Sequence, residues 1–157
     1  MGPEFFMGKQ VFHLCVGHRL EWIKRFKQRA YMKQKSLVSI VESSMHPNYS
    51  ELYSKKGLIE TKVNSIRKAI SQIKKTPVDY IVAEFFYAYS TNYSGVHKSN
   101  LDVLLISLAK YSPQTRVIVL VEKKEHQYVE VLNALNFPLH GVLVHPARAE
   151  QIEALLT

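Results

Sequence analysis

Short apolar runs alternate with stretches of helical spacing along almost the whole chain, and this alternation restricts the fold more than any other feature. Strands are predicted at Val11–Val16, Ser36–Val41, Tyr80–Phe85, Val117–Val121 and Val142–Val144. Helices are predicted at Glu21–Met32, Leu58–Ile73, Leu101–Lys110, Glu125–Leu135 and from Ala147 onward, with a short helical turn near Glu51–Tyr53. This order indicates an α/β fold: a doubly wound, five-stranded parallel sheet with helices on both faces, arranged as a three-layer sandwich.

The chain of 157 residues is long enough for one domain with a sizeable core. Its hydrophobic fraction of 46% and charged fraction of 22% are those of an ordinary globular domain. No apolar stretch approaches the roughly 18 residues of a membrane span, so we expect a cytoplasmic protein. Residues 1–6 are interpreted as an expression scar, and residues 7–157 as a single domain cut from a longer protein.

Several kinds of catalytic or binding chemistry lack their sequence signals. The single cysteine, Cys15, excludes an intrachain disulfide framework, and no tight cysteine–histidine spacing indicates a metal site. A phosphate-binding loop, a nucleophile elbow and a dinucleotide fingerprint are all missing from the sequence. We therefore expect a non-enzymatic protein without a cofactor or a bound metal.

One carboxylate stands at a position that often carries function in such folds. Glu84 ends the apolar run Tyr80–Ala83, which follows the turn signal Thr76-Pro77. In open α/β sheets, ligands and reactive groups gather at the carboxyl ends of the strands. Glu84 is therefore the first candidate for a functional residue.

Three segments resemble parts of the receiver domains of response regulators. Residues 77–84 look like the third strand of that family, residues 115–121 like the fourth, and residues 141–146 like the fifth followed by its proline. The resemblance covers about Val11 to Leu156. It implies a flavodoxin-like sheet with strand order 2-1-3-4-5 and a role in signal transduction within a two-component system.

The phosphorylation chemistry of that family does not carry over to these residues. Val16 and Gly17 match the acidic pair that holds magnesium, and Glu84 matches the phosphoacceptor aspartate. Val121 matches the small hydroxyl residue, and His145 matches the conserved lysine. Because phosphoryl transfer depends on positioning and charge neutralisation by metal and lysine, the resemblance implies a pseudo-receiver that is not phosphorylated at this site.

Glu84 has two further interpretations. It can be a structural carboxylate at the rim of the sheet, paired with Lys123, Lys124 or His145, and such a cation would lower its pKa. As a carboxylate one methylene longer than aspartate, it could also mimic part of the phosphorylated state.

Two segments are candidate interaction surfaces. The aromatic loop after the third strand carries Tyr87, Tyr89 and Tyr93, which could bind a protein, stack on a flavin or base, or cover the pocket. The basic segment Arg19–Lys35 carries seven Lys and Arg and one Glu, with Lys24, Arg25 and Lys27 at its centre. Residues 1–75 hold 15 Lys and Arg against 5 acidic residues, whereas residues 76–157 hold 6 against 8.

The sequence thus predicts a phosphorylation-independent regulatory module that acts through protein–protein contacts, in a homodimer or with an attached output domain. In the family the fourth and fifth helices often form a dimer face, so Glu125–Leu135 and Arg148–Leu156 are candidates. A flavodoxin-like domain that binds a small molecule or nucleotide is one alternative. A binder of nucleic acid or anionic surfaces through the basic half is a second, less expected one.

Overall fold

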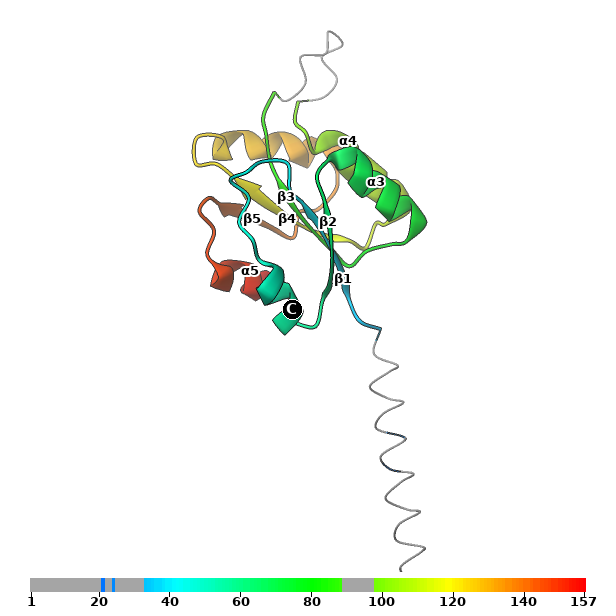
Figure 1. Cartoon of the computed structure of the whole chain (residues 1–157). Coiled ribbons are helices and arrows are strands. Elements are labelled where there is room, and N and C mark those ends of the chain that lie inside the picture. Colours follow the sequence, from blue (N-terminus) through cyan, green and yellow to red (C-terminus); the bar gives the residue numbers. More distant parts are fainter. Residues whose placement is uncertain (1–20, 22–23, 25–32, 89–97) are drawn as a thin grey trace, which may run out of the picture. The chain divides into compact units, whose positions relative to one another are not determined.

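The computed structural model describes residues 21, 24, 33–88 and 98–157 (Figure 1). The chain divides into two compact units, Met1–Gln34 and Lys35–Thr157, and the second unit contains the whole described sheet. Of the predicted first helix, only Glu21 and Lys24 are described, and both are helical. The predicted strand Val11–Val16 lies outside the described residues. Among the described residues, none of the helices is long and apolar enough to span a membrane.

The second unit alternates strands and helices as the sequence predicts. Its strands are β1 (Ser36–Ile40), β2 (Ile59–Val63), β3 (Tyr80–Glu84), β4 (Arg116–Val121) and β5 (Gly141–Val144). Its helices are α2 (Ser50–Lys55), α3 (Ile66–Lys75), α4 (Asp102–Tyr111), η1 (His126–Leu135) and α5 (Ala149–Leu155). All strand pairs are parallel, and their order is β2-β1-β3-β4-β5. The predicted fold class and strand order are therefore confirmed.

The identity of the first two strands differs from the prediction. The segment expected to be the second strand, Ser36–Val41, is the first strand of this sheet, and β2 lies inside the predicted helix Leu58–Ile73. In Ile59–Val63, polar Glu60 and Lys62 alternate with β-branched residues, which suits an edge strand. The helix begins only at Ile66, where the Ser65 hydroxyl accepts a hydrogen bond from the Lys68 backbone N–H.

Helices cover both faces of the sheet (Figure 1). On one face, α3, α4 and η1 pack against alternate residues of the central strands, among them Val38, Ile81 and Val119. On the other face, α2 and α5 pack through Tyr53 and Ile152. Because β1, β3 and β4 are covered on both sides, their residues form nearly continuous buried apolar runs. This rigid centre fixes the position of the strand ends.

Two helix ends follow the sequence signals, and one helix has a tighter geometry than expected. Asn136 stops the segment His126–Leu135 in a left-handed conformation with φ of 53°, as the sequence predicts. That segment is a 3₁₀ helix rather than an α-helix. Gly57 ends the short helix α2 with φ of +70°, which a residue with a Cβ rarely adopts.

Candidate functional site

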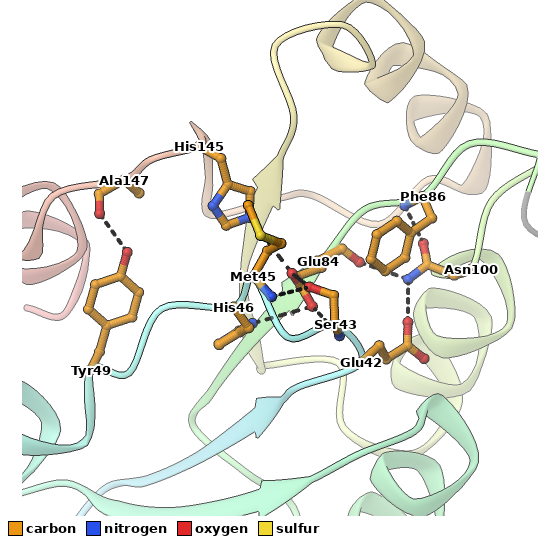
Figure 2. A network of polar contacts seen from close by, with 10 residues as sticks. All are labelled: Glu42, Ser43, Met45, His46, Tyr49, Glu84, Phe86, Asn100, His145 and Ala147. Atoms are coloured by element: carbon orange, nitrogen blue, oxygen red, sulfur yellow. Dashed lines mark hydrogen bonds and ion pairs between the residues drawn. The ribbon is translucent and has the colours of Figure 1, made fainter.

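Glu84 lies at the carboxyl end of the central strand β3, and its side chain is bound by the loop that follows β1 (Figure 2). The Ser43 hydroxyl donates to Oε1 at 2.5 Å, and the Ser43 backbone N–H donates to Oε2 at 3.1 Å. The side chain of Glu84 is only 4% exposed. Both carboxylate oxygens are therefore engaged by one residue of a neighbouring strand end.

Two histidines approach the same carboxylate. His46 Nδ1 lies 3.6 Å from Oε2, and His145 Nε2 lies 3.9 Å from Oε1. Both separations are longer than an ordinary hydrogen bond, so each histidine acts on Glu84 as a charge partner when it is protonated. Burial raises the pKa of Glu84, but the interactions with His46 and the hydrogen bonds from Ser43 outweigh it and lower the pKa below its ordinary value. Glu84 is thus a carboxylate at neutral pH.

Asn100 connects Glu84 to a second acidic residue. Its Nδ2 group donates to the backbone carbonyl of Glu84 at 2.7 Å and to Glu42 Oε2 at 2.9 Å. Its Oδ1 atom accepts a hydrogen bond from the Phe86 backbone N–H at 2.8 Å. Asn100 is buried just before α4, so the network joins the ends of β1 and β3 to the start of that helix (Figure 2).

A pocket of about 460 Å³ lies beside Glu84. Its polar side chains are Glu84, Glu122, Ser43 and His145, and its apolar lining includes Phe85 and Leu120. Among the described residues, no lysine or arginine lines it. The described lining thus holds two carboxylates, of which Glu122 pairs with Lys124 at 2.9 Å.

The structure places the other predicted site residues as follows. Val121 ends β4 and is fully buried, with no hydroxyl to offer. Of the predicted partners of Glu84, His145 faces it, whereas Lys124 pairs with Glu122 at 2.9 Å. Tyr87 is 38% exposed. Val16, Gly17, Arg25, Lys27, Tyr89 and Tyr93 lie outside the described residues.

The position predicted for the acidic pair is corrected by the strand assignment. Because β1 is Ser36–Ile40, the residues that follow the first strand of the sheet are Val41, Glu42 and Ser43, and one of them is a carboxylate. Sequence reasoning missed Glu42 and Ser43 because it began the sheet one strand too early. A carboxylate directly after a buried β-branched strand was the available signal.

The acidic side chains at these strand ends already accept hydrogen bonds from their neighbours. Magnesium takes oxygen ligands such as carboxylates, which are commonly hydrogen-bonded as well. Here the Asn100 amide donates to the Glu42 carboxylate and to the Glu84 carbonyl, and Ser43 binds both Glu84 side-chain oxygens. No group of three or more His, Cys, Asp or Glu that could hold a metal occurs in residues 33–88 and 98–157.

The sheet order and helix arrangement define a flavodoxin-like α/β domain, and solved structures give the closer comparison. A response regulator receiver domain protein from Clostridium thermocellum is 15% identical, with a TM-score of 0.58, over 78% of this chain and 90% of that chain. The N-terminal domain of a response regulator/sensory box/GGDEF 3-domain protein from Carboxydothermus hydrogenoformans is 13% identical, with a TM-score of 0.58, over 78% and 90%. The chain therefore has the fold of response-regulator receiver domains.

A third similar structure contains a phosphorylated aspartic acid. It is a response regulator from Burkholderia pseudomallei with a phosphorylated aspartic acid, a calcium ion and citrate. It is 16% identical, with a TM-score of 0.54, and the match covers 78% of this chain and 66% of that one. No protein-family model and no curated protein matches the chain.

Proposed function

We propose that this chain is a non-enzymatic regulatory module with a receiver-like fold that works without phosphorylation and acts through protein–protein contacts. The observation that carries the proposal is the state of Glu84, whose two carboxylate oxygens already accept hydrogen bonds from Ser43. The nearby basic groups are histidines, and the adjacent pocket contains a second carboxylate, Glu122. A phosphoryl group would need compensating positive charge that these side chains do not supply.

The network around Glu84 also suggests how such a module holds its shape. Ser43, Asn100 and His145 come from the ends of different strands and loops, and all contact Glu84. In a phosphorylated receiver, the bound group would draw such elements together. Here a permanent carboxylate holds them in one arrangement, so a partner would meet a surface that does not depend on a donor.

The proposed contact face includes η1 and the edge strand β5. Tyr128 of η1 stacks on Tyr87 with ring centroids 4.1 Å apart and an interplanar angle of 12°. Tyr87 and Tyr128 are each 38% exposed, and Val144 of β5 is 36% exposed. Exposed tyrosines beside an open strand edge suit a protein partner, either a second copy of the chain or an attached output domain. The GGDEF-containing 3-domain protein illustrates an arrangement in which such a domain is followed by others.

The test uses the phosphoryl analogue beryllofluoride with magnesium, monitored by amide chemical shifts of the labelled protein. We expect no saturable shift at Ser43, Glu84, Asn100 or His145. Saturable shifts at these four residues would contradict the proposal, because they would show that the pocket accepts a metal-bound phosphoryl group.

A further inference from the structure

A second pocket, of about 350 Å³, lies where β1 and β2 end. It is lined by residues of both strands, of the loop between β1 and α2, and of the first turn of α3. Its volume falls within the range of small-molecule sites, roughly 300–1,000 Å³. Its polar lining includes Lys62, Lys68, Asn48, Asn64, His46 and Tyr53.

Two exposed lysines, Lys62 and Lys68, bring positive charge to this pocket. Lys62 Nζ donates to Asn48 Oδ1 at 3.2 Å, and Lys68 Nζ donates to Asn64 Oδ1 at 2.8 Å. Within the described part of the chain, neither ammonium group has a carboxylate at ion-pair distance, whereas Lys55 and Lys124 each contact a glutamate at 2.8 and 2.9 Å. The two ammonium groups are thus held by neutral amides and can still pair with an anion.

A buried hydroxyl without a partner among the described residues lines the same pocket. The Tyr53 side chain is fully buried, yet its hydroxyl makes no hydrogen bond to the described residues. The His46 ring also lines the pocket, and its Nδ1 atom lies 3.6 Å from Glu84 Oε2. A buried hydroxyl without a partner is unfavourable, so a ligand atom that accepts from Tyr53 would be favoured there.

One acidic residue, Glu60, also lines the pocket, and its negative charge opposes the positive charge of the two lysines. Its Oε1 atom accepts a hydrogen bond from the Ser39 hydroxyl at 2.6 Å, which fixes the carboxylate on β1. Burial raises the pKa of Tyr53, and the nearby Glu60 charge raises it further. Tyr53 is therefore a neutral hydroxyl that can donate, and the two lysines outnumber the single carboxylate.

We propose that this pocket binds a small organic anion, whose phosphate or carboxylate group is held by Lys62 and Lys68 and also accepts from Tyr53. The site differs from the Glu84 pocket, which has no lysine in its described lining. It goes beyond the proposed regulatory function, because it gives the module a ligand of defined charge. His46 lines this pocket and also faces Glu84, so a bound anion would lie one side chain away from the Glu84 network.

The test titrates the full chain with inorganic phosphate, with citrate and with sodium chloride at matched ionic strength, and follows amide chemical shifts. We expect saturable shifts at Asn48, Lys62 and Asn64 with phosphate or citrate, and the stronger of the two identifies the anionic group. The proposal would be overturned if neither phosphate nor citrate gave saturable shifts, or if chloride gave equal shifts. The lysines would then only attract counterions.

Paired variants separate a defined site from general charge. Lys62→Ala with Lys68→Ala is expected to weaken binding roughly tenfold or more, since each lysine contributes a charge-assisted hydrogen bond. Lys55→Ala with Lys124→Ala removes the same net charge at residues outside the pocket lining and should leave the affinity unchanged. An equal loss of anion affinity in both double variants would contradict a defined site at Lys62 and Lys68.

Two further measurements address Tyr53 and His46. Tyr53→Phe keeps the buried ring and removes a hydroxyl that has no partner among the described residues, so it should fold normally and bind the anion more weakly. Unchanged affinity would remove Tyr53 from the site.

Anion binding should also shift the amide resonance of Ser43. An unchanged Ser43 resonance would disprove the connection through His46. Because beryllofluoride tests a different pocket, failure here leaves the proposed function separately testable.

Discussion

Ser43 donates two hydrogen bonds to Glu84, from its hydroxyl to Oε1 at 2.5 Å and from its backbone N–H to Oε2 at 3.1 Å. One residue at the end of β1 thus engages both oxygens of a buried carboxylate at the end of β3 (Figure 2). The carboxylate is satisfied by the protein itself and lies next to histidines rather than a lysine. This arrangement supports the proposal that the module works without phosphorylation.

Ser43→Ala should destabilise the protein by about 1.5–3 kcal/mol, because it removes a hydrogen bond to a buried charged group. The same change also removes the acceptor of the Met45 backbone N–H. Ser54→Ala, at an exposed position of α2, serves as the control and should change stability by no more than about 0.5 kcal/mol. Urea unfolding curves measure both variants, and equal effects would show that the bond to Glu84 contributes nothing.

Glu84→Gln should reduce the loss of stability in acid. The pKa of Glu84 is lowered in the folded state, so the contribution of its carboxylate is fully present above the ordinary pKa of 4.5. That contribution is lost as the pH falls below 4.5 and through the lower folded-state value. Thermal unfolding from pH 7 to pH 3 should show a steeper loss for the wild type than for the variant. Parallel curves would mean that Glu84 is not stabilised in its charged form.

Asn100→Ala should cost roughly 2–4 kcal/mol, because Glu42 and the Glu84 carbonyl both lose a donor in a buried setting. Asn133→Ala removes the same amide from an exposed position of η1 and should have little effect. Unfolding by urea compares the two. A small effect at Asn100 would indicate that the ends of β1 and β3 are held together by other contacts.

Val144→Asp should weaken self-association if the face formed by η1 and β5 is the contact between two copies. Val144 is an exposed apolar residue on the edge strand, and a charge there opposes strand-edge and apolar contact. Val103→Asp adds the same charge to an exposed position of α4 and should leave association unchanged. Sedimentation over a range of protein concentrations measures both. A wild type that stays monomeric at high concentration would contradict the dimer and leave an output domain as the partner.

The central strands could be predicted from the sequence because burial on both faces gives continuous apolar runs such as Tyr80–Ala83 and Val117–Val121. The edge strand β2 could not, since Ile59, Val63 and Ile66 also fit helical spacing and Glu60 and Lys62 interrupt the apolar run. Edge strands carry polar residues, so they lack the continuous apolar run that identifies central strands.

Glu84 could be predicted as a candidate because strand ends in such sheets are recognisable. Its partners Ser43, His46 and Asn100 come from loops, where no periodicity indicates which side chains converge. The prediction counted the apolar run Val11–Val16, which lies outside the described residues, as the first strand and so made Ser36–Val41 the second, whereas Ser36–Ile40 is β1. That error hid the carboxylate of Glu42 next to the site.

The most direct test of phosphorylation independence is intact-mass measurement after incubation with acetyl phosphate and magnesium, for the wild type and for Glu84→Asp. The variant restores the residue type that accepts the phosphoryl group in receiver domains, while the histidines and the pocket carboxylate Glu122 stay in place. We predict no phosphoryl adduct on either protein, since the described lining of the pocket beside residue 84 contains His145 and no lysine or arginine. A phosphoryl adduct at position 84 in the wild type or in the variant would contradict this account.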